Sequence, residues 1–516
     1  MASILGLKGY NKSASTSNIL LAAYGNDIIN VATGLGYGLA LNGNDVEMEA
    51  FLDRIFAQNY NTSPITFNGT TWSRDYTSRM PISKYLRAWK SRLYLGNCLF
   101  DGPQAPLDAS SNAIVMPSKV FYPDFFQGNT LTWGIEWGRN GATTAGTRIF
   151  EAKNVNGLPQ DFKANNIKVG DPLFITSGNA QLVSERPYLV TSVESPYRIL
   201  VDRDFPVSAT SLHYWVGSNW FDVATDDNDY ITWIEENNDQ LVLWKRFSLW
   251  RYNQTSLQRI KNAPGTTSGR SVANMGDLTI YFHASNTNTR KTGFYGYNGS
   301  RSVLVSRAIQ PYIDGISLSA TPVAWREGTK YRCYVGTITN TPKGISVSNA
   351  VITLDVEGNQ WQIDPIADVV TASGRWIESG AEKYFIGTND NEVMETPSGN
   401  SHNGDPISWA IEKGVTYPSG SEVVNEFTRI QVVSRNAAGV QFLYKLFGTP
   451  EDDDDQWHSL GDIKHNHQEF VFKTKHNMGR GIDVRFQERS TGVNTLLIQK
   501  ITGFCVPITT NPTQKP

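Results

Sequence analysis

The densest charge in the sequence is a run of five carboxylates, Glu451-Asp452-Asp453-Asp454-Asp455. Adjacent carboxylates repel one another unless water surrounds them or a cation binds them. A solvated loop is the simpler interpretation. The sharper one is a loop that faces a channel and repels DNA phosphates, so that a passing duplex does not adhere. We take Glu451 to Asp455 as a candidate channel-facing acidic loop.

Histidines form the second group of residues that could do chemistry. Four of the seven lie near the C-terminus, namely His458, His465, His467 and His476. His465 and His467 would share one face of a strand, as metal ligands do, but the sequence places no third ligand beside them. We favour polar surface residues over a metal site, and we predict no metal-binding or cofactor-binding residues.

Catalytic motifs do not emerge from the sequence, which contains no G-x-S-x-G, HExxH or G-x-x-x-x-G-K-[ST]. Gly34 to Gly38 lacks the GxGxxG spacing and the following helix of a dinucleotide loop, and so predicts a loop or bulge. Residues 66–72 echo the sialidase motif S-x-D-x-G-x-T-W without its Ser and Asp, which favours a turn next to a core aromatic. We predict no catalytic residues and a protein that is not an enzyme. A carboxylate pair assembled from distant segments stays open, because sequence spacing does not report spatial separation.

Composition narrows the function further. The 516 residues are long enough for two or three domains, the net charge is -3, and charged residues make up 18%. Such a chain lacks the basic surface that sequence-specific nucleic-acid binding requires. Cys98, Cys333 and Cys505 lie far apart, which indicates neither a disulfide framework nor a zinc site. We read no export signal and no membrane span.

Strands, not helices, must position these residues, because 44 glycines and 23 prolines interrupt most helical patterns. One pattern recurs, in which an aromatic or β-branched run is followed by a polar turn and a second such run. It predicts six hairpins, over residues 54–69, 85–96, 241–250, 278–299, 331–356 and 383–395.

The spacing of these hairpins predicts a β-propeller. Their marker positions at 54, 92, 241, 278, 331 and 383 differ by 38, 149, 37, 53 and 52 residues. Four-stranded propeller blades occupy roughly 40–50 residues each. The single long gap leaves room for a small inserted domain of on the order of 100 residues.

The domain organisation follows from these spacings. Residues 1–102 are expected to form an N-terminal arm, which lies within residues 1–17, and the first blades. Residues 227–435 are expected to form the remaining blades. Residues 103–226 contain three β-rich runs and predict an inserted barrel-like domain, with further irregular blades as the alternative. Residues 436–508 predict a C-terminal β-rich segment, sandwich-like or a closing blade, in which Ile482, Val484 and Phe486 alternate with polar neighbours. A polar tail occupies 509–516. The predicted fold class is all-β.

Several of these segments resemble one known family. They are Phe67-Asn68-Gly69-Thr70-Thr71-Trp72, Tyr297-Asn298-Gly299-Ser300, the stretches 302–306 and 311–315, and residues 479–486. They resemble the β-propeller tail proteins of short-tailed bacteriophages, called hub, nozzle or DNA-stabilisation proteins. The similarity covers most of the chain as a style of repeat.

The resemblance implies a structural virion protein of the tail, assembled in the bacterial host cytoplasm. Its partners would be copies of itself in a hexameric ring, the portal or adaptor, fibre or spike proteins, and double-stranded DNA passing non-specifically. It implies no cofactor and transfers no catalytic residue. Two alternatives stay open on the same scaffold: a tail-associated polysaccharide-degrading enzyme and a receptor-binding protein.

Overall fold

The computed structural model describes most of the chain, and all that follows concerns the described residues. These are residues 3–11, 18–74, 79–100, 105–124, 131–152, 161–183, 186–285, 291–339, 346–378, 380–396, 401–402, 405–406, 410–412, 414–420, 423–435, 440–448, 457–472, 477–488 and 497–507. The chain divides into two compact units, Met1–Pro397 and Ser398–Pro516.

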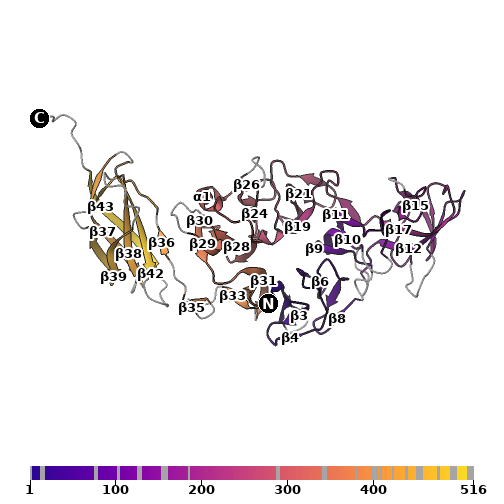
Figure 1. Ribbon diagram of the computed structural model, residues 1–516, viewed down its shortest axis with the longest axis horizontal. Helices are drawn as coiled ribbons and strands as arrows, with labels where there is room; N and C mark the ends of the chain where they lie inside the picture. The colour runs from indigo at the N-terminus through magenta and orange to yellow at the C-terminus, as the bar shows by residue number, and fades with distance from the viewer. Residues whose placement is uncertain are drawn as a thin grey trace. The chain divides into compact units, whose positions relative to one another are not determined.

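Seven sheets of the first unit form a ring that Figure 1 shows. The first sheet contains β1 (Ile4–Asn11), β2 (Asn18–Tyr24), β3 (Asp27–Asn30) and β4 (Leu35–Gly36). The second contains β5 (Glu47–Phe51), β6 (Arg54–Gln58), β7 (Ile65–Phe67) and β8 (Trp72–Ser73). The third contains β9 (Ile82–Trp89), β10 (Arg92–Leu99), β11 (Val115–Phe121) and β18 (Trp220–Asp222). The next two are β19 (Ile231–Asn237), β20 (Gln240–Lys245), β21 (Leu249–Tyr252) and β22 (Leu257–Arg259); and β23 (Ala273–Asn274), β24 (Thr279–His283), β25 (Gly293–Tyr297) and β26 (Ser302–Leu304). The last two are β27 (Val323–Glu327), β28 (Lys330–Ile338), β29 (Val347–Asp355) and β30 (Gln360–Pro365); and β31 (Val370–Glu378), β32 (Ala381–Thr388) and β33 (Val393–Thr396).

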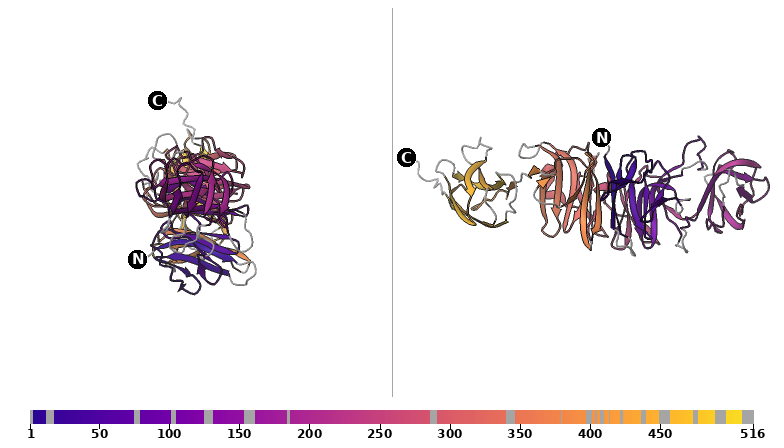
Figure 2. Two further views of the ribbon diagram at one scale, coloured as in Figure 1. Left: turned by 90° about the vertical axis from the view of Figure 1, so that its right-hand side faces the viewer. Right: turned by 90° about the horizontal axis from the view of Figure 1, so that it is seen from below.

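The contacts between these sheets identify a seven-bladed β-propeller. The first strand of each sheet contacts the first strand of the next, from β1 through β5, β9, β19, β23 and β27 to β31, and β31 contacts β1 again. Hydrophobic cores lie between neighbouring blades, for example Leu7, Leu20 and Ala372 between the first and the last. The predicted propeller is therefore confirmed (Figures 1 and 2).

The six predicted hairpins are all present as antiparallel pairs. Five of them are the second and third strands of a blade, whereas 85–96 lies in the first and second strands, β9 and β10. Residues 4–11 differ from expectation. We placed them in an exposed arm, but they form β1, the innermost strand of the first blade, with Ile4 and Tyr10 buried. The expected polar tail, 509–516, lies outside the described residues.

A closed six-stranded barrel is inserted in the third blade, between its third and fourth strands. Its strands are β12 (Ile135–Thr143), β13 (Ile149–Ala152), β14 (Pro172–Ser177), β15 (Tyr188–Ser195), β16 (Arg198–Val201) and β17 (Ala209–Gly217). The flanking strands β11 and β18 pair with each other and belong to the propeller. The insertion thus leaves the blade's hydrogen-bonded sheet intact. Three short helical segments complete the unit: η1 (Gly269–Ser271), η2 (Ser306–Ile309) and α1 (Gln310–Ile313).

The second unit is a β-sandwich. One sheet contains β36 (Ala410–Glu412), β42 (Gly481–Glu488), β38 (Val440–Phe447) and β39 (His458–Ile463), and the other contains β40 (His467–Val471), β37 (Asn425–Arg435), β41 (Met478–Gly479) and β43 (Leu497–Pro507). The unit begins earlier than we expected, because β36 and β37, which lie within the stretch 227–435 assigned to the blades, belong to it. A short pair, β34 (Ser401–His402) and β35 (Asp405–Pro406), precedes them. Both sheets contribute to one core, which includes Ile482, Val484 and Phe486, as their alternation predicted.

Candidate functional site

The inner strands of the propeller surround a cavity of about 520 Å³. Strands β1, β5, β9, β19 and β31 contribute to its wall, and so does the segment η1. Inner strands converge on the axis of a propeller, so residues far apart in the sequence meet here. Seven charged side chains line the cavity: Lys8, Glu47, Glu49, Arg87, Glu236, Arg270 and Arg375.

Ion pairs link the inner strands of four successive blades. Lys8 Nζ of β1 lies 2.7 Å from Glu49 Oε2 of β5, and Arg87 Nη1 of β9 lies 3.6 Å from the same oxygen. Arg87 also pairs through Nη2 with Glu235 of β19. The side chains of Glu49 and Glu235 are only 11% and 6% exposed, so their charges depend on these partners.

Arg270, in η1, holds the first and last blades. Its guanidinium donates hydrogen bonds to the carbonyl oxygens of Thr371 at 2.6 Å and Leu5 at 2.7 Å. It also lies 3.3 Å from a carboxylate oxygen of Asp45, in the connection between the first two blades. One side chain thus joins segments of β31, β1 and the β4–β5 connection.

The pKa values of the two carboxyl groups on β5 are shifted in opposite directions. Burial raises the pKa of Glu47 to about 7, and Arg270 only partly counteracts this. Burial would also raise the pKa of Glu49, but Lys8 and Arg87 lower it below its ordinary value. Glu49 is therefore ionised at neutral pH, whereas Glu47 is close to half protonated. A protonated and an ionised carboxyl in one cavity are the groups that acid–base chemistry uses.

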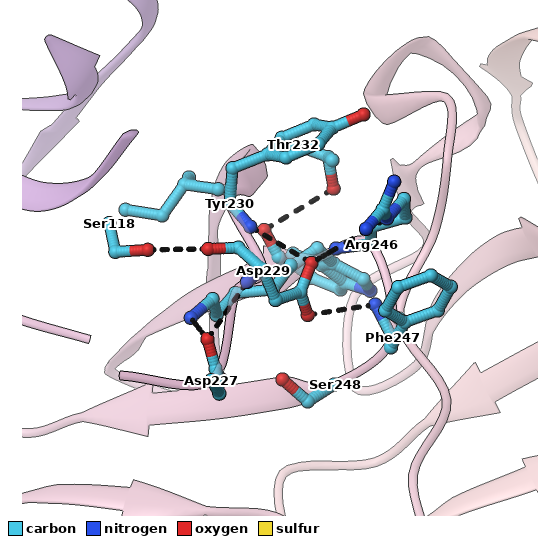
Figure 3. Close-up of polar contacts among 12 residues, drawn as sticks. Ser118, Asp227, Asp229, Tyr230, Thr232, Arg246, Phe247 and Ser248 are labelled. Carbon is cyan, nitrogen blue, oxygen red and sulfur yellow. Dashed lines mark hydrogen bonds and ion pairs between the residues drawn. The ribbon is translucent and has the colours of Figure 1, made fainter. Parts of the chain in front are cut away.

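A second polar cluster fixes the connection between β18 of the third blade and β19 of the fourth (Figure 3). The ammonium of Lys245 is fully buried and donates to the carbonyl oxygens of Val223 and Ala224, both at 2.8 Å, and to Asp227 at 2.5 Å. The Asp229 carboxylate accepts hydrogen bonds from the backbone N–H groups of Tyr230, Arg246 and Phe247. The Ser118 hydroxyl donates to the Asp229 carbonyl. These groups satisfy one another, which indicates a structural role.

None of the described residues that line the axial cavity was singled out in the sequence. Glu451 to Asp455 and His476 lie outside the described residues. His465 and His467 are exposed at the β39–β40 turn and the start of β40, and His458 is half-buried in β39. Among the described residues, no group of three or more His, Cys, Asp or Glu side chains is arranged to hold a metal ion.

Local hydrogen bonds and packing explain the glycine-rich motif of residues 34–38 and the motif of residues 66–72. The Asp27 carboxylate accepts hydrogen bonds from the N–H groups of Gly38 at 2.7 Å and Leu39 at 2.9 Å. The segment 34–38, which we predicted as a loop or bulge, thus folds onto a side chain and contains the short edge strand β4. In residues 66–72, the Asn68 side chain accepts hydrogen bonds from the N–H groups of Thr70 and Thr71. The rings of Phe67 and Trp72 pack with centroids 5.1 Å apart. This segment is the turn beside core aromatics that we predicted.

Sequence reasoning missed the axial residues. Apart from Glu47 and Glu49, which share β5, they come from different blades or from η1, so no local motif joins them. The one local signal is a charged residue at alternate positions of an otherwise apolar strand, as at Glu47 and Glu49.

The three cysteines are unpaired, Cys98 and Cys333 buried and Cys505 half-buried. No helix in the described part of the chain has the length and apolar character needed to span a membrane.

Comparison with known proteins finds only remote similarity. No protein family and no curated protein matches the sequence. Among solved structures, a Phage phi92 endosialidase is 10% identical with a TM-score of 0.20 and covers 85% of this chain and 65% of its own. A Trypanosoma rangeli sialidase is 9% identical with a TM-score of 0.30 and covers 97% and 94%. A puromycin hydrolase is 9% identical with a TM-score of 0.28 and covers 74% and 50%. The chain thus spans under two thirds of the endosialidase and half of the hydrolase, and the fold assignment rests on the strand pairing above.

Proposed function

We propose that this protein is a structural protein of a bacteriophage tail, a hub or nozzle subunit that forms a ring around the DNA channel with copies of itself. In that position it connects the portal or adaptor to distal tail parts or fibres, and it helps retain and deliver the genome. The ring is expected to be a hexamer, assembled in the bacterial host cytoplasm and carried in the virion. The protein binds no cofactor in this role.

The observation that supports this proposal most is that charged side chains around the axis pair with one another. Lys8, Glu49, Arg87 and Glu235 are paired across four successive blades. In an enzyme, such side chains would be directed at a substrate, whereas here they pair with one another. Ion pairs of this kind favour one arrangement of the blades, which is what a rigid scaffold requires.

The two accessory modules support the same role. The barrel enters the third blade between β11 and β18 without interrupting their pairing, and the sandwich follows the last blade. Extra contacts with partners are naturally built on such insertions, because the propeller core is left unchanged. The acidic run 451–455 stays a prediction of a loop that repels DNA phosphates at the channel.

The experiment that tests this proposal compares phage particles with and without the protein. Particles lacking it are expected to package DNA but to lose it, or to lack fibres, as seen by electron microscopy and by protection of DNA from nuclease. Full, stable, appendage-bearing particles without the protein would overturn the proposal. Electron microscopy of the purified full chain should show a ring with a central opening.

A second candidate function is polysaccharide degradation by a tail-associated enzyme, and Glu47 favours it. A carboxyl with a pKa of about 7 in a cavity suits a general acid, and glycoside hydrolysis needs such a group opposite an ionised carboxylate. This candidate predicts that the full chain shortens host capsule or lipopolysaccharide polymer and that Glu47→Gln stops the reaction. Adhesion to host cells without polymer loss would instead favour a receptor-binding protein.

A further inference from the structure

The outer edge of the seventh blade differs from that of the other six. In those blades a short fourth strand pairs with the third: β4, β8, β18, β22, β26 and β30. In the seventh blade, β33 pairs with β32 and, among the described residues, with no other strand. An outer strand without a neighbour presents backbone N–H and C=O groups that can pair with another chain.

Side chains at this edge are only partly covered. Val393 contacts the core between the seventh and first blades, and Met394 contacts the core between the sixth and seventh, and both are half-buried. The hydroxyl of Thr396 is buried without a hydrogen-bond partner among the described residues. A buried polar atom without a partner is uncommon and calls for an explanation. A missing neighbouring strand would explain it.

The complete blades show what a fourth strand contributes. Trp72 of β8 packs on Phe67 at 5.1 Å between ring centroids, Phe221 of β18 stacks on Tyr252 of the next blade at 4.3 Å, and Trp361 of β30 lies 5.7 Å from Phe294 of the preceding blade. The fourth strand therefore adds an apolar side chain to the sheet's outer end. At β33 the corresponding apolar contact is to be expected opposite Met394.

The charged side chains near β33 indicate which charge its partner should carry. Lys383 of β32 lies 2.6 Å from Glu378 and 3.2 Å from Glu395, so two carboxylates share one ammonium. Nearby, Arg375 and Glu382 neutralise each other at 2.9 Å. Glu395 of β33, which is 40% exposed, therefore shares its cation with Glu378 of β31, and its negative charge is incompletely neutralised. A basic residue opposite Glu395 would complete the pairing, since opposite charges across neighbouring strands stabilise a sheet.

We propose that β33 accepts an extended segment of another protein as the fourth strand of the seventh blade. The segment has a basic residue that pairs with Glu395 and an adjacent apolar residue that packs on Met394. The backbone supplies affinity, and these two side chains supply specificity. This interaction surface goes beyond the tail role and does not depend on it.

The probe for the test is a fluorescent synthetic peptide of residues 254–262. It contains a fourth strand of this same propeller, β22, which ends at Arg259 and is followed directly by the apolar Ile260. We expect the full-length protein to bind the peptide, measured by fluorescence anisotropy. Glu395→Lys should weaken binding by about fivefold or more, because an attraction becomes a repulsion. The matched control is Glu194→Lys in the barrel, whose carboxylate is also 40% exposed and which should bind as the wild type does.

Hydrogen exchange of the unmodified protein tests the same surface without any variant. The amides of β33 should exchange faster than those of β25, which lies between two strands, and they should slow when the peptide is added. Absence of binding at about 1 mM peptide would overturn the proposal. So would slow exchange of β33 in the free monomer, which would mean that the chain already covers the edge. Self-association that Glu395→Lys abolishes would also overturn it, because the occupant would then be a second copy.

Discussion

The charged residues around the propeller axis differ in how many partners they have, and this difference decides what each can do. Arg87 bridges Glu49 and Glu235, which are both nearly buried, whereas Arg375 lines the same cavity with a side chain that is 63% exposed. Removing the partner of a charge that water solvates costs little folding stability. Removing the only cation beside a buried carboxylate costs much more.

Replacing Arg87 is therefore expected to destabilise the propeller strongly. Arg87→Met keeps most of the side-chain volume but leaves Glu235 buried without its cation. We expect the free energy of unfolding to fall by about 3 kcal/mol or more, measured by urea denaturation. Arg375→Met is the control and should cost about 1 kcal/mol or less. Equal effects of the two substitutions would show that the ion pairs do not hold the blades together.

Glu47 makes stability depend on pH. Its pKa is about 7 in the native state because of burial, against 4.5 for an ordinary glutamate. Between these values the native state holds a proton that the unfolded state releases, so the free energy of unfolding decreases as the pH rises from about 4.5 to 7 and then levels off.

The substitution Glu47→Gln should remove this pH-dependent decrease in the free energy of unfolding. At pH 8 the variant is expected to be more stable than the wild type by up to about 3 kcal/mol, and at pH 5 the difference should fall below about 1 kcal/mol. Urea denaturation at the two pH values measures both. A difference that does not change with pH would contradict the raised pKa.

At the scale of single elements, four of the turns between a third and a fourth strand have the same hydrogen-bonding pattern. Asn68, Asn253 and Asn298 each follow an aromatic residue at or just after the end of the third strand, and each side chain accepts hydrogen bonds from the N–H groups two and three residues later. Asp355 does the same before β30. This Asx turn reverses the chain within a few residues, so that a fourth strand can pair with the third.

Removing one of these turns should cost a modest amount of stability. Asn68→Ala leaves the Thr70 and Thr71 N–H groups to water, and we expect a loss of about 0.5–1.5 kcal/mol in urea denaturation. Asn68→Asp keeps an oxygen acceptor and should stay within about 0.5 kcal/mol of the wild type. If both variants lose the same stability, the accepting oxygen is not what the turn requires.

The hairpins were predictable from sequence and the axial site was not. An aromatic or β-branched run, a polar turn and a second such run are local, so the six hairpins could be found one at a time, and in four of them the second run leads into one of these Asx turns. The first blade was missed because Ile4 to Asn11 contains Gly6 and Gly9, which weaken a strand signal. The residues of the axial cavity become neighbours only when the blades close into a ring, and no spacing in the sequence reports that.

At the scale of the molecule, Gly9 of β1 and Gly374 of β31 serve the closure of the ring. Every blade is built from strands of its own stretch of chain, so closure depends on packing between β1 and β31. A Cβ on Gly9 would lie 2.8 Å from the Cα of Trp376, and one on Gly374 would lie 2.7 Å from the Cβ of Leu7. The two strands approach so closely that neither position has room for a side chain. The Thr371 hydroxyl, which donates to the Ile4 carbonyl at 2.6 Å, adds a hydrogen bond across the closure.

Gly374→Val should therefore open the ring at this point. The added methyl groups meet the backbone and Cβ of Leu7, which cannot move without displacing β1, and we expect a loss of about 2–3 kcal/mol or more. Differential scanning calorimetry should show a lower unfolding temperature for the propeller and an unchanged transition for the sandwich, because the two units have separate cores. The control is Gly503→Val in β43, where no described atom lies within 4 Å of an added Cβ. If Gly374→Val left the propeller transition in place, closure would depend on other contacts, with the Arg270 and Thr371 hydrogen bonds to β1 the first to examine.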